Sequence, residues 1–168
     1  MTRTDSKDRG PSILVLGACL LAFGLRAYRL GEQSLWGDEA YSVLRAGMSL
    51  GDLAREGLRE GTLPPLYYYA LHFWLPIAGR SEYAVRFLSV AFALVTLPVL
   101  YLLLRRLLRT PGAVGGVLVA GMAPFLVYYS QETRMYSQAV FLTVLSTYLL
   151  VRNLEGEAGA RDVARGLV

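Results

Sequence analysis

Apolar residues in this chain gather into long runs that are separated by short polar stretches. The first run covers residues 11–30, and a helix needs about 20 residues to cross a bilayer, with Arg26 and Arg29 reaching back to the interface. Three later runs are close to this length and cover residues 86–104, 113–129 and 135–151. The pattern predicts an all-α, polytopic membrane protein with about four transmembrane helices.

A long polar segment, residues 31–63, follows the first run. Asp38 is a suitable N-cap for a helix that carries Tyr41 and Leu44 on one side. Ser49 can cap a second helix whose apolar positions also repeat at helical spacing. Both patterns predict short amphipathic helices that lie in the membrane interface, and a loose surface loop is the alternative.

Residues 64–78 are apolar but too few for a comfortable span, and Pro76 interrupts them. This length favours a re-entrant or interfacial helix, so that residues 31–85 form one outer loop. The arginine cluster at residues 105–109 then lies in the cytoplasm with the N-terminus, as the positive-inside rule prefers. Asp38 and Glu132 fall together on the outer side. If residues 64–78 crossed the membrane, the two carboxylates would be separated.

Composition supports a membrane protein, because 54% of the 168 residues are hydrophobic and the mean hydropathy is +0.40. The net charge of +4 indicates topology rather than nucleic-acid binding, since the arginines are dispersed along the chain. Cys19 stands alone, which excludes a disulfide framework. The first apolar run lacks a small-residue cleavage site and is expected to stay as an uncleaved helix. Residues 1–10 are polar and are predicted to form a disordered cytoplasmic tail.

Two adjacent carboxylates, Asp38 and Glu39, are the first candidates for chemistry. Successive side chains on a helix point about 100° apart, so one groove can use only one of them directly. Asp38, at the mouth of the predicted helix, is the better candidate to accept a proton or hold a cation. A plain helix cap is the alternative. Trp36 fits either an interfacial anchor or a surface on which a sugar stacks.

Glu132 and Arg134 form a second polar cluster, between the third and fourth predicted spans. Arg134 has the planar fork that matches phosphate oxygens, although a simple ion pair in a turn explains both residues as well. Arg86 could also face a phosphate or could snorkel to the interface. His72 has no partner at metal-ligand spacing, which favours interfacial burial. Tyr67 belongs to an aromatic belt or, less expectedly, lines a lipid groove.

Four motifs appear in a fixed order, at residues 34–42, 63–68, 84–89 and 129–136. In this order they resemble integral-membrane glycosyltransferases of the dolichyl-phosphate-mannose–protein mannosyltransferase type. This type belongs to the C-type glycosyltransferases and includes the bacterial aminoarabinose transferases. The resemblance covers about residues 12–152.

The resemblance implies an inverting transfer of a sugar from a polyprenyl-phosphate carrier to an acceptor hydroxyl. The acceptor would be a lipid, a glycan or a protein, on the outer side of a bacterial cell membrane. No cofactor is required, although a divalent cation held by Asp38 and Glu132 is chemically plausible. The implied catalytic residues are Asp38, Glu39 and Glu132. The implied substrate-binding residues are Arg134, Tyr136, Arg86, Trp36, Pro65 and Tyr67.

The chain departs from the family pattern in two ways. Leu63 stands where relatives often have a histidine before the proline pair, and relatives are several times longer. Residues 11–168 therefore look like the N-terminal part of the transmembrane domain, which we expect to be inactive alone. A non-catalytic membrane scaffold, whose carboxylates only cap helices, is the main alternative. A small transporter would need ionisable residues deep inside its spans.

Overall fold

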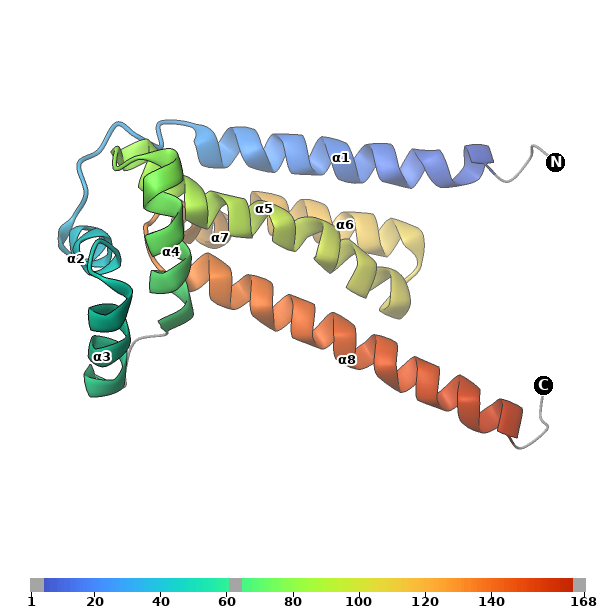
Figure 1. Cartoon of the computed structure of the whole chain (residues 1–168). Coiled ribbons are helices and arrows are strands. Elements are labelled where there is room, and N and C mark those ends of the chain that lie inside the picture. The colour runs from blue at the N-terminus through green and yellow to red at the C-terminus, as the bar shows by residue number, and fades with distance from the viewer. Residues whose placement is uncertain (1–4, 61–64, 165–168) are drawn as a thin grey trace.

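The computed structural model describes residues 5–60 and 65–164, and every regular element in this part of the chain is a helix (Figure 1). The all-α class expected from the sequence is therefore confirmed. In chain order the helices are α1 (Asp5–Ala27), α2 (Gly37–Ala46), α3 (Leu50–Glu60), α4 (Pro65–Ala78), α5 (Glu82–Leu107), α6 (Thr110–Met122), α7 (Pro124–Ser130) and α8 (Tyr136–Ala164).

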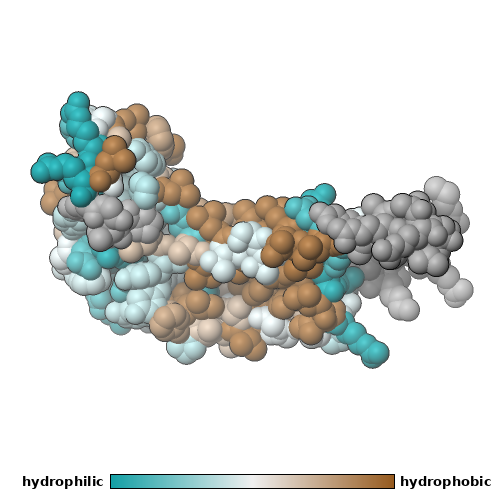
Figure 2. All heavy atoms as spheres, turned by 90° about the horizontal axis from the view of Figure 1, so that it is seen from below, coloured by the Kyte–Doolittle hydropathy of each residue, from teal (hydrophilic) through white to brown (hydrophobic). Residues whose placement is uncertain are grey.

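The helices form two groups. Helices α1, α5, α6 and α8 run alongside one another, whereas α2, α3 and α4 lie across one end of them (Figure 1). Helix α5 is central, because it packs against α1, α4, α6 and α8. Apolar side chains cover much of the long helices on the face seen in Figure 2. This distribution fits long helices that face lipid and a cap of short helices outside it.

Two described helices are long and apolar enough to cross a membrane: α1, over Gly10–Ala27, and α5. Helices α6 and α7 together make a third candidate, bent by 54° at the break between them. Pro124 begins α7 and accounts for the bend. Helix α8 has the length of a span but does not meet the same criterion. Its apolar run is short, because polar residues begin the helix and charged residues follow Val151. The fourth span stays a prediction.

Helix α1 begins at Asp5, within the segment that was expected to be a disordered tail, and residues 1–4 lie outside the described part. Adding residues to an existing helix costs far less than starting one, so the apolar helix extends into the polar segment. Arg26 also differs from expectation. It does not snorkel but is 1% exposed, and its Nη1 donates to the carbonyl oxygens of Ala22 and Gly121.

The first interfacial helix begins differently from the prediction. Trp36, not Asp38, takes the N-cap position of α2, and Asp38 lies in the first turn. The Trp36 amide donates to Glu39 Oε2 at 3.4 Å, so the second acidic residue satisfies a free N–H of the helix start. The prediction for α3 is confirmed, because Ser49 Oγ accepts from the amide of Asp52 at 3.2 Å.

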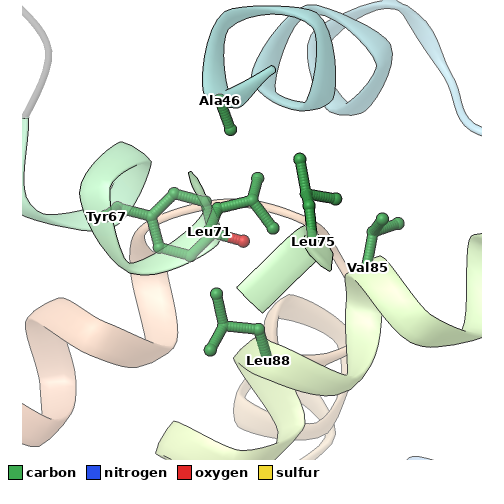
Figure 3. Close-up of a cluster of buried hydrophobic side chains, with 6 residues drawn as sticks. All are labelled: Ala46, Tyr67, Leu71, Leu75, Val85 and Leu88. Carbon is green, nitrogen blue, oxygen red and sulfur yellow. The ribbon is translucent and has the colours of Figure 1, made fainter. Parts of the chain in front are cut away.

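Helix α4 has 14 residues, fewer than a span requires, and lies across the end of the long helices (Figure 1). This placement agrees with the interfacial interpretation of residues 64–78. Its buried face joins α2 and α5 in one core (Figure 3). His72 Nδ1 donates to the Ala46 carbonyl at 2.8 Å, which ties α4 to the end of α2. The core residues are Ala46, Tyr67, Leu71, Leu75, Val85 and Leu88.

Candidate active site

Two turns that are distant in the sequence meet at the capped end of the long helices. One joins α1 to α2, and the other, residues 131–135, joins α7 to α8. The Thr133 amide donates to Glu39 Oε1 at 2.9 Å, across 94 residues of sequence. Arg134 Nη2 lies 3.5 Å from Asp38 Oδ2. The structure therefore brings the two predicted acidic segments together.

Glu39 is fully buried and forms the central ion pair of this junction. Arg86 Nε donates to Oε1 at 2.9 Å and Nη2 donates to Oε2 at 2.7 Å, in the two-pronged geometry that arginine favours. Burial acts to raise the pKa of Glu39, but the hydrogen bonds from Arg86 and the Thr133 amide outweigh it and hold that pKa below its usual value. Both carboxylate oxygens are occupied. This geometry favours a positioning role for Glu39 over the catalytic role that the resemblance implied.

Arg86 was expected either to snorkel to the interface or to face a phosphate, but its guanidinium makes contacts inside the protein. Its Nη1 donates to the carbonyl oxygens of Leu30, at 2.9 Å, and Gln33, at 2.8 Å, and its Nη2 donates to that of Ser34 at 3.3 Å. A single guanidinium thus fixes the irregular turn that leads into α2. The expected substrate contact is replaced by an internal one, because the partners of Arg86 lie about 50 residues away along the chain, where spacing gives no signal.

Asp38 is the open carboxylate of the adjacent pair. Its side chain is 55% exposed, while that of Glu39 is 0% exposed, so the two residues face different surroundings as the helical geometry predicts. The neighbouring Arg134 side chain is 11% exposed. Its Nη1 donates to the Asp38 carbonyl at 3.4 Å, and its Nε is buried without a hydrogen-bond partner. Asp38 can thus meet a ligand from solvent beside a cation with unused donor capacity.

Glu132 lies on the wall of a cleft of about 390 Å³. The cleft is also lined by two exposed aromatic residues, Trp36 and Tyr128, and by Glu39 and Arg86. Burial raises the pKa of Glu132 above its usual value, and the charges of Glu39 and Asp38 act in the same direction. Tyr128, whose hydrogen bond acts to lower the pKa of Glu132, was not singled out from the sequence.

Glu132→Gln is expected to stabilise the protein increasingly as the pH rises. Folding raises the pKa of Glu132 above its usual 4.5, so the carboxyl favours the folded state when protonated. This contribution is complete below the unfolded-state pKa and is lost as the pH rises through the folded-state pKa. Melting temperatures of parent and variant should converge near pH 4 and diverge toward pH 7, roughly the range over which a shifted glutamate titrates. A difference that stays constant with pH would contradict the assignment.

Metal binding finds limited support in the side chains. Within residues 5–60 and 65–164, no group of three or more histidine, cysteine, aspartate or glutamate side chains could hold a metal ion. Asp38 and Glu132 would together supply two ligands. A hard cation usually takes six or more oxygens, so most of its ligands would have to come from substrate or water. We therefore derive no catalytic step that depends on a metal.

The remaining predicted substrate residues are dispersed. Tyr67 is 1% exposed in the α4 core, with its hydroxyl 3.1 Å from Ser89 Oγ, so it lines no lipid groove. Pro65 begins α4 on the surface, and Leu63, where relatives often have histidine, lies outside the described residues. Tyr136 packs edge-on against Tyr129, on the wall of an apolar groove between the long helices. Of this set, Trp36 alone lines the Glu132 cleft.

Gln131 is a structural residue that sequence reasoning missed. Its Nε2 donates to the carbonyl oxygens of Arg26 and Tyr28, both at 3.1 Å, where α1 ends. Gln131 thereby satisfies carbonyls at the end of α1, while Arg26 does the same for Gly121 near the end of α6. Together these contacts position the turn that carries Glu132. The only sign of this role in the sequence was that Gln131 stands next to Glu132 in the polar motif.

A comparison with known families identifies the type of protein. The family model described as dolichyl-phosphate-mannose-protein mannosyltransferase matches residues 62–162. The chain belongs to this family. No curated protein and no solved structure matches it. Arg86, Glu132 and Arg134 fall inside the matched residues, whereas Asp38 and Glu39 precede them. The chain is thus a membrane protein of mannosyltransferase type, and its family uses polyprenyl-phosphate sugar donors in general.

Proposed function

We propose that this mannosyltransferase-family chain helps to transfer a sugar from a polyprenyl-phosphate donor to an acceptor hydroxyl. Exposed Asp38 beside Arg134 is the observation that carries the proposal. The pair combines a proton acceptor with a cation that can face a phosphate. The buried Glu39–Arg86 pair beneath it holds both turns in place. In a scaffold whose carboxylates only cap helices, Asp38 would be expected to cap α2. Instead Asp38 is exposed and Trp36 is the N-cap.

The proposed step is a single displacement with inversion at the anomeric carbon. The acceptor oxygen forms a bond to that carbon while its proton passes to Asp38. The bond between the anomeric carbon and the phosphate oxygen breaks, and the electron pair leaves with the polyprenyl phosphate. Negative charge grows on the departing phosphate, so a nearby cation lowers the barrier. Neither a nucleotide nor a metal ion enters this step.

Arg134 is the group that we assign to the departing phosphate. Its side chain comes from the turn before α8, and its Nη1 and Nη2 contact Asp38 at 3.4 and 3.5 Å. Its ion pair with Asp38 at 3.5 Å is longer than a close charge-assisted hydrogen bond. Substrate can therefore compete for the guanidinium without breaking a tight contact.

The reaction would take place on the outer side of the membrane. Asp38 and Glu132 lie at the capped end of the long helices, whereas Arg105 and Arg106 lie in the last turn of α5, at the opposite end, where α1 begins (Figure 1). Short arginine-rich loops favour the cytoplasm. This charge distribution supports a cytoplasmic N-terminus and an external site.

Arg134→Gln is expected to lower kcat/KM for sugar transfer by roughly 10²–10³-fold, the usual effect of removing one transition-state charge contact. Because we expect residues 11–168 to be inactive alone, transfer here and for every other variant would be measured with the intact transferase in membranes, using a labelled polyprenyl-phosphate sugar. Arg55→Gln is the matched control, because Arg55 is an exposed arginine paired with Asp52 on α3. Equal loss in both variants, or none in Arg134→Gln, would refute the assignment.

A further inference from the structure

A second cavity lies between the long helices and is separate from the candidate active site. It is an apolar groove of about 450 Å³ whose walls come from α1, α5, α6, α7 and α8. It shares no lining residue with the Glu132 cleft, and Tyr129 and Tyr128, adjacent on α7, face one cavity each. A ligand bound in the groove would therefore occupy a site separate from the Glu132 cleft.

Arg26 is the only charged residue among those that line the groove. Its Nη1 makes both of its side-chain hydrogen bonds, and its Nε is buried without a partner. Among the described residues no carboxylate is paired with it. An uncompensated arginine inside an apolar groove is costly. The charge thus calls for an anion that enters together with an apolar group.

The shape of the groove fits a lipid with one chain inserted. Arg26 lies in the last turn of α1, at the capped end, where a headgroup would be found. From Ser137 to Val144 the groove follows α8 for about 10 Å, at 1.5 Å per residue. Contacts with a chain give little net gain inside a bilayer, because lipid tails are equally apolar. Preference for one lipid must therefore come from Arg26 and the headgroup.

We propose that this groove binds one acyl chain of an anionic bilayer phospholipid whose phosphate pairs with Arg26. Phosphate accepts the parallel donors of a guanidinium, and a net negative headgroup matches the single positive charge of the groove. The separation of the groove from Asp38 and Glu132 favours a bilayer lipid over the sugar donor. The proposal does not depend on the proposed transfer reaction.

The test uses the chain in nanodiscs that contain equal amounts of phosphatidylglycerol and phosphatidylcholine. Either lipid carries a photoactivatable group on its acyl chain, and labelled residues are mapped by mass spectrometry. We expect labelling along Ala139, Val140 and Val144, with phosphatidylglycerol preferred by roughly tenfold or more, as a charge-assisted hydrogen bond provides. Equal labelling by both lipids would overturn the proposal.

Two variants separate the charge from the groove itself. Arg26→Gln should remove the preference for phosphatidylglycerol, whereas Arg29→Gln, at an exposed arginine, should keep it. Because Arg26 also supports α6, Ala139→Phe serves as the second variant. It fills the groove and should reduce labelling at Val144, while Val119→Phe, at an exposed position outside the groove, should not. Labelling at Val144 that persists in Ala139→Phe would refute the proposal. So would labelling that added polyprenyl phosphate suppresses and added phosphatidylglycerol does not.

Discussion

Glu39→Gln is expected to lower the free energy of unfolding by about 3–5 kcal/mol, the usual cost of removing one partner from a buried ion pair. The variant leaves the charge of Arg86 buried and uncompensated. It also weakens the contact to the Thr133 amide, which joins the turn before α8 to α2. Because one carboxylate holds three elements together, the loss should exceed that of any other single acidic residue in the described part of the chain.

Thermal unfolding of the purified protein in detergent measures this loss. Glu32→Gln is the matched control, since Glu32 pairs with Arg29 on the surface, where both side chains are more than half exposed. Exposed pairs contribute about 0–1 kcal/mol, so this variant should melt close to the parent. The double variant Glu39→Met with Arg86→Met should lose less than the two single changes combined, because no charge remains buried. Additive losses would show that the pair is not coupled.

Asp38→Asn is expected to lower kcat for sugar transfer by about 10²–10⁴-fold, the range that general base catalysis supplies. The amide cannot accept the acceptor's proton, although its shape is nearly the same. The effect on stability should stay below about 1 kcal/mol, because Asp38 is exposed and Trp36 is the N-cap. Changing Glu39 should therefore lower mainly the stability, whereas changing the neighbouring Asp38 should lower mainly the activity.

Asp52→Asn provides the control for Asp38→Asn. Asp52 is also an exposed aspartate in the first turn of a short helix, α3, and it also pairs with an arginine, Arg55 of the same helix. Transfer, expression and membrane insertion should all be unchanged in this variant. A silent Asp38→Asn would leave only the scaffold interpretation, in which the carboxylate serves the helix start.

Length and hydrophobic patterning sufficed to predict most of the fold. The expected runs at residues 86–104 and 113–129 correspond to α5 and to the bent pair α6–α7, because a run of apolar residues long enough to cross a bilayer has few other stable conformations. The short length of residues 64–78 indicated an element outside the spans. Asp38 was wrongly predicted as the N-cap because the N-cap of the helix lies two residues earlier, at Trp36, whose amide donates to Glu39. Only tertiary packing decides between two such starting points.

The site was predictable in its acidic residues but not in its arginines. A carboxylate next to a helix start has a local signal, and the divergence of Asp38 and Glu39 follows from helical geometry alone. Arg86 binds Glu39 and three turn carbonyls, and Arg26 binds a carbonyl 95 residues away. No periodicity relates such partners. Arg26 was therefore predicted to snorkel to the membrane interface, and Arg86 either to snorkel or to face a phosphate. Both predictions assume a side chain that has no partner inside the protein.

The account depends most on Asp38 and Glu132 facing the same aqueous compartment. Single cysteines at positions 38, 107 and 132, in a Cys19→Ala background, can be labelled in intact cells with a membrane-impermeant maleimide. Cysteines 38 and 132 should react from outside, because Asp38 is exposed and a smaller side chain at 132 leaves the cleft open, while cysteine 107 should react only after permeabilisation. Labelling of 38 and 132 from opposite sides of the membrane would contradict the account.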